Sequence, residues 1–495
     1  MIGNRTRRLI AGLAAGVLLA GCAAERVPQA PRRTLSDESP FADVEPVPPD
    51  RPRPQTPSLD APLSVGECIR FALDNNPRVG SSWHRVRAAA ALVGQAEASY
   101  YPQLEFNARS ERTETPVLTE VESKFIRSVH SANFTVTQLL LDGGARRARL
   151  ASAKAGLVSE DLIHDSTLLD VALDAEAACY ELLAAQARQE VEQENVRART
   201  RQLELAERRL ETGLGRSIEV SQARAERADA VLNEVVARAG VRAGRGQLAS
   251  VMGLLPSTPL VVRDLPEADR ARQIEAAEAL IEEAALNRPR LRSAVAEMRR
   301  LEAQLKAEKA GRWPTLNLSG LYGWRDTHIL PEERKEWSIA LNLNWPLFTG
   351  FDRTYRIRQA EAQLRQLRGE YDSLLQSVEL EVWNAYSELL RADEAIVAAE
   401  QFLDSARESV ESVEQAYAAG KATILELTDA QTVFVRAANR KVTARLGRHL
   451  AVARLERAVG RAWNSGLDAP EGAAPEETSL PITPARAADD EAGGR

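Results

Sequence analysis

The chain of 495 residues has little cysteine, histidine or aromatic side chain: three Cys, five His and 5% Phe, Trp and Tyr. Its cysteines, at positions 22, 68 and 179, show no CxxC spacing, and the histidines are scattered. This excludes the usual metal-ligand clusters, so we expect no metal and no cofactor. We expect Cys68 and Cys179 to be small buried hydrophobes, with a disulfide between them as the alternative.

Motifs for catalysis and nucleic-acid binding are also missing. The sequence contains no glycine-rich phosphate loop and no nucleophile elbow of the Ser/His/Asp type, so we expect no enzyme. Lys and Arg number 64 against 71 Asp and Glu, a formal net charge of −7. An acidic chain of this kind is not expected to bind nucleic acid.

The longest apolar run lies at the amino end, after three arginines, and covers residues 9–20. It is shorter than the roughly 20 residues that a membrane-spanning helix needs, so residues 1–21 are predicted to be a cleaved signal peptide. The run ends Leu-Ala-Gly-Cys, which resembles a bacterial lipobox, with Cys22 as the lipidated first residue of the mature chain. Ala23 follows it, and by resemblance to lipoprotein sorting this favours the outer membrane.

Two segments have the composition of unstructured chain. Residues 22–62 are rich in proline and are predicted to form an extended tether behind the lipid. Residues 463–495 are rich in proline, alanine and acid and are predicted to be a disordered tail.

The body of the chain contains an internal sequence repeat. Asn75-Asn76-Pro77 recurs as Asn287-Arg288-Pro289, a shift of 212 residues, and the Tyr-Pro at 101–102 recurs as Trp-Pro at 313–314. Glycine motifs around 143 and 213 recur around 350 and 420, a shift of 207 residues. The ordered recurrence predicts one duplicated architecture, with repeats at 63–255 and 271–462 joined by a linker at 256–270.

Long helices dominate each repeat. The stretches 144–211 and 351–419 lack proline, and each would run about 100 Å if helical throughout. Shorter helices, predicted at 78–100, 217–254, 290–312 and 424–460, would stack in pairs along the long ones. Ser64 and Glu67 have the spacing of a capping box at the start of a small preceding helix. Apolar residues of the second long stretch alternate in steps of three and four, as in a coiled coil: Ile357, Ala360, Leu364, Leu367, Tyr371, Leu374 and Val378.

Alternating segments lie between the helices. Residues 316–324 and 337–345 alternate apolar with small or polar residues, and 104–108 and 132–136 do so more weakly. Strands of about nine residues with Trp and Tyr near their ends suit a tilted membrane crossing, although a half-buried soluble hairpin is the alternative. The polar segment 325–336 is predicted to be an exposed extracellular loop.

Four strands cannot close a barrel, and an open edge in lipid would leave its backbone polar groups without partners. The chain is therefore expected to oligomerise. Three copies with twelve strands are the smallest arrangement that we expect to leave an open lumen.

The order of these motifs over residues 60–462 resembles the TolC-like outer-membrane efflux protein family, in its lipoprotein branch. The resemblance implies a mainly α fold, with long helical hairpins forming a periplasmic tunnel and four strands per protomer in a trimeric twelve-stranded barrel. It implies a passive channel in the outer membrane, held among its lipids, that works with a periplasmic adaptor protein and an inner-membrane efflux pump.

The same resemblance places a periplasmic gate in the stretch from Tyr417 to Ala430, which includes Leu425. Glu426 and Asp429 stand where family members carry acidic or polar gate residues, and Glu219 and Gln222 match them in the first repeat. Tyr417 resembles a residue that ties neighbouring helix pairs in the closed state. Thr423 and Glu426 also form a capping box, which is the structural alternative for this acid.

Three functions follow as hypotheses. The leading one is the outer-membrane channel of a tripartite efflux system for small molecules or ions. A conduit for type I protein secretion uses the same fold. The hypothesis of another class is a structural coiled-coil lipoprotein of the envelope, which needs neither strands nor a pore.

Overall fold

The computed structural model describes residues 62–117, 123–263, 276–327 and 334–461. The predicted signal peptide, Cys22, the tether up to residue 61 and the tail from 463 lie outside the described residues, as do 264–270 of the predicted linker. The boundaries proposed for the repeats stay predictions.

The described chain is mostly helical, and its two longest helices have equal length. They are α4 (Ala145–Glu211) and α8 (Asp352–Ala418), 67 residues each, as the two proline-free stretches predicted. The shorter helices are α2 (Val65–Asn75), α3 (Pro77–Ala98), α5 (Ser217–Val251), α6 (Ala277–Asn287), α7 (Pro289–Ala310) and α9 (Ile424–Val459). Predicted and observed bounds of α3, α5, α7 and α9 differ by at most three residues.

Local sequence signals account for the helix ends. The predicted capping box is present at α2, where Glu67 N donates to Ser64 Oγ at 3.2 Å and Ser64 N donates to Glu67 Oε2 at 2.8 Å. Prolines occupy the first turn of α3 and of α7, where a missing N–H is harmless. The turns after the long helices place Gly213 and Gly420 at φ +75° and +74°, a conformation that favours glycine.

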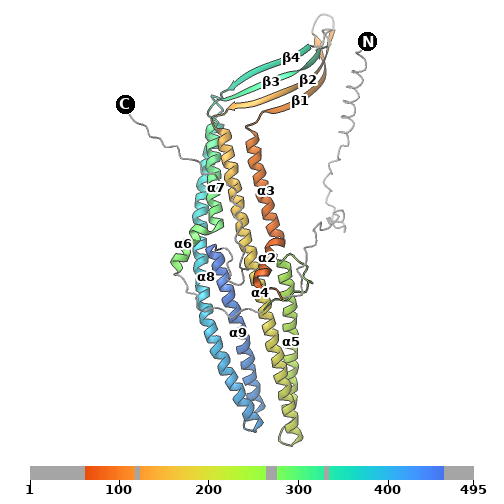
Figure 1. Ribbon diagram of the computed structural model, residues 1–495, viewed down its shortest axis with the longest axis vertical. Helices are drawn as coiled ribbons and strands as arrows, with labels where there is room; N and C mark the ends of the chain where they lie inside the picture. Colours follow the sequence, from red (N-terminus) through yellow and green to blue (C-terminus); the bar gives the residue numbers. More distant parts are fainter. Residues whose placement is uncertain (1–61, 118–122, 264–275, 328–333, 462–495) are drawn as a thin grey trace, which may run out of the picture. The chain divides into compact units, whose positions relative to one another are not determined.

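The helices form a layer with the same order in both repeats (Figure 1). In the half nearest the sheet, α4 packs against α3 on one side and α7 on the other, and α7 packs against α8. In the distal half, α4 packs against α5 and α9, and α9 packs against α8. The pairs α4/α5 and α8/α9 are therefore the two distal hairpins, and α4 touches helices of both repeats.

Buried apolar side chains form a separate core in each repeat. One core gathers residues of α2, α4 and α5, and the other gathers residues of α6, α8 and α9. The predicted coiled-coil seam of α8 is confirmed, since Ile357, Ala360, Leu364 and Val378 are buried and the three residues between them are half-buried. Cys68 and Cys179 are buried and free, as predicted for small hydrophobes, so the structure does not contain the disulfide that was the alternative.

A buried carboxylic acid lies in the first core. Glu176 of α4 accepts a hydrogen bond from the Tyr180 hydroxyl at 2.7 Å, and the Tyr180 ring lies 5.0 Å from that of His449 on α9. Burial raises the pKa of Glu176 to about 7, with a smaller contribution from Glu456 and opposed by the Tyr180 hydrogen bond. The folded chain therefore holds this proton more tightly than the unfolded chain does.

Replacement of Glu176 by Gln is expected to stabilise the fold above about pH 4.5, with the full effect reached above about pH 7. Because the folded pKa is raised above 4.5, wild-type stability falls as the pH rises from about 4.5 to about 7, by about 3 kcal/mol at most. Thermal unfolding in detergent should give the variant a higher midpoint at pH 8 and nearly equal midpoints at pH 4.5. Glu181→Gln, on an exposed site of α4, is the control, and an equal shift at both pH values would contradict the prediction.

The four strands form one antiparallel sheet in the order β1-β2-β3-β4. They are β1 (Gln103–Val117), β2 (Ser123–Leu141), β3 (Thr315–Thr327) and β4 (Arg334–Asn344). The prediction of about nine residues per strand was wrong, since the strands have 15, 19, 13 and 11 residues. Only the apolar part of each strand alternates clearly, and the ladder continues beyond it through polar residues.

The prediction that residues 325–336 form a loop was wrong at both ends, because the strands continue beyond their apolar parts. Arg325 and Asp326 belong to β3, and residues 334–336 belong to β4. Arg325 and Glu336 form an ion pair of 3.0 Å between these strands, so charge at this site supports strand pairing. Residues 328–333 between them, including Pro331, lie outside the described residues, and their exposure at the cell surface stays a prediction.

Candidate functional site

The distal tips of the two hairpins carry the predicted gate residues. Both tips turn in the same way: Leu214 N donates to Arg209 O at 2.9 Å in the first, and Lys421 N donates to Ala416 O at 2.8 Å in the second. Each turn caps the carboxyl-terminal end of a long helix and leads directly into the next helix. The tips are thus fixed by backbone hydrogen bonds, which leaves their side chains free to differ.

Glu426 serves as a helix cap in this structure. Its Oε2 accepts from Thr423 N at 2.6 Å and from the Thr423 hydroxyl at 3.0 Å, and Glu426 N donates to Thr423 Oγ1 at 3.3 Å. The backbone hydrogen bond from Thr423, followed by that from its hydroxyl, lowers the pKa of Glu426. The capping box that was the structural alternative for Glu426 is therefore present. The Glu426 side chain is also exposed.

Asp429 lies one turn further along α9 and is exposed. It forms no ion pair with the residues that the structure describes. Leu425 is 57% exposed on the same turn, whereas Leu427 and Thr428 are buried against the hairpins. The structure thus brings Leu425, Glu426 and Asp429 to the accessible side of the tip, where charge on Asp429 is available to solvent.

Tyr417 lies at the junction of the two tips and is only 1% exposed. Arg209, in the last turn of α4, donates from Nη1 to the Tyr417 carbonyl oxygen, and its guanidinium carbon lies 4.7 Å from the centre of the Tyr417 ring. Burial is the main reason that the pKa of Tyr417 is raised, and the nearby Glu219 carboxylate adds to it. The site therefore joins an arginine, an aromatic ring and a carboxylate from both hairpins.

Arg209 was not predicted from the sequence. Ala422, in the second tip, packs against the apolar cluster around Tyr417 and offers no charged partner there. Arg209 comes from the other repeat, 208 residues away, so no local pattern pairs it with Tyr417. Gln222, the other predicted residue of the first tip, is half-buried one turn beyond Glu219.

Above the tips, the hairpins meet through buried hydrogen bonds. Arg199 of α4 is 4% exposed and donates to the Thr432 hydroxyl of α9 at 3.0 Å, and Gln202 donates to the Thr428 hydroxyl at 3.0 Å. Burial lowers the pKa of Arg199. Within each hairpin, by contrast, small apolar clusters join the two helices. Each hairpin is thus held internally by apolar packing, and the seam between them is largely polar.

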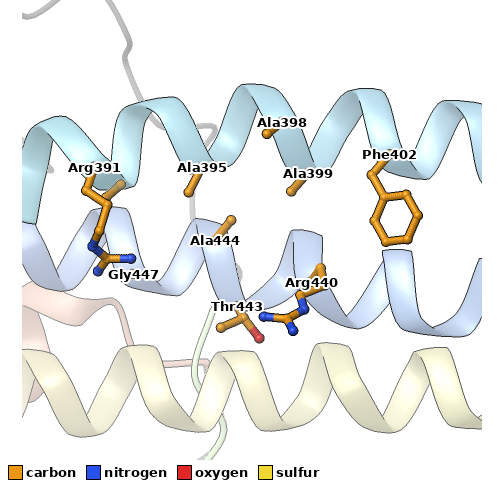
Figure 2. A pocket seen from close by; sticks show the side chains of 10 residues that line it. Arg391, Ala395, Ala398, Ala399, Phe402, Arg440, Thr443, Ala444 and Gly447 are labelled. Carbon is orange, nitrogen blue, oxygen red and sulfur yellow. The ribbon is translucent and has the colours of Figure 1, made fainter.

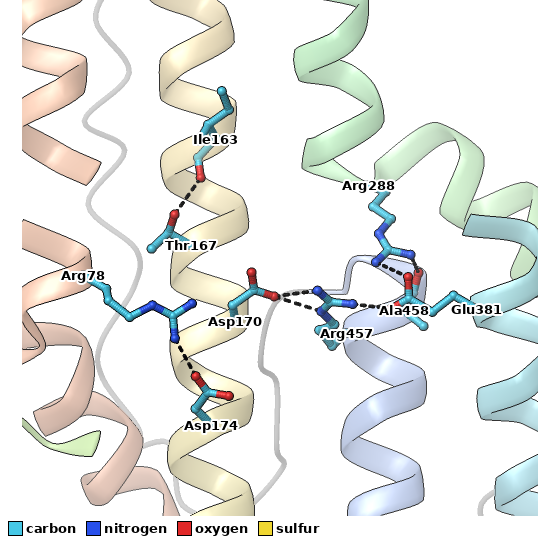
Figure 3. A network of polar contacts seen from close by, with 9 residues as sticks. All are labelled: Arg78, Ile163, Thr167, Asp170, Asp174, Arg288, Glu381, Arg457 and Ala458. Carbon is cyan, nitrogen blue, oxygen red and sulfur yellow. Dashed lines mark hydrogen bonds and ion pairs between the residues drawn. The ribbon is translucent and has the colours of Figure 1, made fainter. Parts of the chain in front are cut away.

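A denser polar network ties the repeats together near the middle of the helix layer (Figure 3). Arg457 of α9 donates to Asp170 of α4 at 2.7 and 3.0 Å and also pairs with Glu381 of α8. Arg288, which precedes α7, pairs with Glu381 at 2.6 Å and donates to the Ala458 carbonyl at 3.3 Å. Four elements therefore share one set of ion pairs, well away from the tips.

A groove runs between α8 and α9 at mid-height of the second hairpin (Figure 2). It encloses about 420 Å³ and is lined mainly by alanines, with Arg391, Phe402 and Arg440 among its larger side chains. It exists because small residues face each other across the helix pair.

The sheet carries a row of aromatic side chains across all four strands. Phe106 pairs with Phe134, Phe134 with Tyr322, and Tyr322 with Trp337. These rings are between 50% and 72% exposed, and Phe106 and Phe134 lie 5.0 Å apart. Exposed leucine and isoleucine follow toward the helices at 104, 339, 341 and 343, and further aromatics, Tyr101, Trp313 and Trp345, are exposed at the helix end of the strands. One face of the sheet therefore has an apolar band between two aromatic rows, the pattern of a membrane strand.

Some kinds of site are missing from the described residues. No group of three or more His, Cys, Asp or Glu in the described ranges is placed to hold a metal ion. None of the helices of the described chain is both long and apolar enough to cross a bilayer.

Comparison with known proteins gives consistent matches. The model of the family described as outer membrane efflux protein matches residues 68–254 and 280–461. Protein CyaE of Bordetella pertussis is 28% identical over 385 residues, 77% of this chain and 80% of that protein. TolC of Vibrio cholerae is 26% identical over 411 residues, 80% of this chain and 90% of that protein. The structure of the outer-membrane channel OprN superposes with a TM-score of 0.72 at 20% identity and covers 81% of this chain and 90% of its own.

Proposed function

Because this chain belongs to the outer membrane efflux protein family, we propose that it forms the trimeric outer-membrane channel of a tripartite efflux system. In this role it conducts small molecules or ions passively and catalyses no reaction. Its partners are a periplasmic adaptor protein and an inner-membrane pump, and its apolar strand band lies in the outer-membrane lipid.

The observation that carries the proposal is the matching order of the sheet and the helix layer. The sheet ends at β1 and β4. The helix layer ends at α3 and α5 on one side and at α8 on the other. Helix α3 leads into β1, and β4 leads into α8. A single rotation that pairs β4 with β1 of the next copy therefore also packs α8 against α3 and α5 of that copy. Three copies would close both the barrel and the tunnel.

The end helices carry the apolar surface that such closure needs. On α8, the exposed residues Leu380, Trp383, Leu390 and Val397 lie outside the seam with α9, and on α5 Leu232 and Val236 are exposed. Exposed apolar stripes of this kind mark interaction surfaces. The structural coiled-coil lipoprotein is disfavoured, because it has no use for a four-stranded sheet with an apolar band.

Trp383→Asp is expected to disrupt the trimer, because it places a charge in the proposed contact between copies. Native mass measurement in detergent should find three copies for the wild type and mainly single copies for the variant. Arg440→Glu, which changes an exposed charge at the α8/α9 groove, should remain trimeric. A wild-type protein with one copy per particle would contradict the proposed closure.

We further propose that the mature chain starts at acylated Cys22, on the strength of the Leu-Ala-Gly-Cys sequence after the apolar run. The lipid is an auxiliary anchor, because the strands hold the body in the membrane. Labelled palmitate should enter the wild type and should be absent from Cys22→Ser. Equal labelling of both proteins would contradict the proposal.

A further inference from the structure

The polar seam between the two hairpins is centred on one buried arginine. Arg199 of α4 donates from Nη2 to the Thr432 hydroxyl at 3.0 Å and to the Thr428 carbonyl oxygen at 3.4 Å, both on α9. From Nη1 it donates to the Gln202 side-chain oxygen at 3.2 Å, and Gln202 donates to the Thr428 hydroxyl at 3.0 Å. Two side chains of α4 therefore form one connected set of hydrogen bonds with two threonines of the other repeat.

This set of hydrogen bonds lies directly beside the gate residues. Thr428 precedes Asp429 in the chain, so the first turns of α9 cannot move away from α4 while these hydrogen bonds hold. Arg199 comes ten residues before Arg209 on α4, which is about 15 Å along the helix. The hairpins are therefore joined twice, at the tip through Arg209 and again above it through Arg199.

Arg199 also has partners within its own hairpin. Glu226 of α5 lies 3.6 Å from the Arg199 Nη2, which is longer than a hydrogen bond. When the hairpins part, Arg199 keeps Gln202 and Glu226, and water reaches its guanidinium and the two threonine hydroxyls. Separation therefore exchanges hydrogen bonds between protein groups for hydrogen bonds to water, which costs little net free energy. The apolar clusters inside each hairpin have no such exchange and stay packed.

We propose that Arg199 is a second latch of the gate, with two alternative states. In the engaged state it binds Thr428 and Thr432 and holds the two hairpins together. In the released state it pairs with Glu226, and the second hairpin moves away from the first and carries Asp429 with it. Arg199 acts on the pore through α9, so it is a positioning residue. The inference rests on the proposed function in one respect, namely that the tips of the channel open.

Two substitutions of Thr432 test the latch in opposite directions. Thr432→Val removes the acceptor of Arg199 at nearly constant volume, so the open fraction should rise about tenfold. Thr432→Glu, at an exposed position, offers Arg199 a carboxylate across the seam, so the open fraction should fall by about the same factor. Both effects should disappear in an Arg199→Gln background.

The matched control is another threonine of α9. Thr443 donates to the carbonyl oxygen of Asn439, four residues earlier, at 2.9 Å, as Thr432 does to that of Thr428 at 2.8 Å. It makes no hydrogen bond to α4 within the described ranges. Thr443→Val should therefore leave the open fraction unchanged.

The open fraction is measured in two independent ways. One is the time spent at the full conductance level in planar bilayers. The other is the rate at which a maleimide labels Leu205→Cys in the purified protein, with the native cysteines of the wild type as the background. Leu205 of α4 packs against the apolar cluster of the second tip, so it is uncovered when the hairpins part.

The two measurements separate the latch from the proposed function. Labelling that responds to neither Thr432 substitution, or to both in the same direction, overturns the latch. Labelling that shifts as expected while no variant gives conductance steps supports the latch and contradicts the proposed channel. Conductance steps with equal open times in Thr432→Val, Thr432→Glu and wild type overturn the latch in a working channel.

Discussion

Asp429→Asn is expected to reduce the cation preference of the channel about five- to thirtyfold. In a trimer the substitution removes three carboxylates from one constriction, and together they stabilise a passing cation by about 1 to 2 kcal/mol in a partly screened aqueous pore. Block by divalent cations should weaken in parallel. The fold should be preserved, because the side chain is exposed and the change is nearly isosteric.

Reversal potentials across a salt gradient, measured in planar bilayers, give the permeability ratio for wild type and variant. Asp404→Asn is the control, because Asp404 is an exposed acid of α8 in the middle of the second hairpin. Unchanged selectivity in a correctly assembled Asp429→Asn trimer would remove Asp429 from the pore. Glu426→Gln would then be the next substitution to test, because Gln can retain the capping hydrogen bonds with Thr423 while it removes the charge.

Arg209→Ala is expected to open the tips and to raise single-channel conductance several-fold. Arg209 is the residue that joins the first tip to the Tyr417 carbonyl and ring of the second. A hydrogen bond to a charged group contributes about 1.5 to 3 kcal/mol, and a cation–π contact about 0.5 to 1 kcal/mol. Their loss shifts a closed tip toward open forms by tenfold or more, because about 1.4 kcal/mol corresponds to a factor of ten.

The control for this variant is the neighbouring residue. Arg208→Ala removes an exposed arginine from the same turn and leaves the tie to Tyr417 in place. Arg209→Lys keeps the charge and loses the planar guanidinium, so its conductance should lie between those of wild type and Arg209→Ala. Equal conductance of Arg209→Ala and Arg208→Ala would show that the tie to Tyr417 does not hold the tips.

Features encoded in short segments were predicted well. Proline-free runs and flanking glycines delimit α4 and α8, and the Ser64/Glu67 spacing identifies the start of α2. The capping of α9 by Glu426 was predictable for the same reason, since the hydrogen bonds link residues three apart. The aromatic positions of β3 and β4 follow from their alternation, although their alignment in one row depends on the register of the sheet.

The missed features depend on contacts between distant segments. The seam residues Arg199 and Gln202 bond to α9 more than 220 residues further along the chain. In the sequence, Arg209 is an ordinary cation near the end of a helix. Only the packing of the two repeats brings it into contact with Tyr417. The outer parts of the strands were missed because their polar residues lack the apolar alternation that marks the membrane band.

The central claim is that three copies of this chain enclose one continuous pore. Single-channel recording of the purified wild-type trimer in planar bilayers tests it most directly. The proposed architecture predicts discrete, ion-selective conductance steps whose size increases in Arg209→Ala. A trimer that inserts into the bilayer and gives no steps, in the wild type and in Arg209→Ala alike, would contradict it.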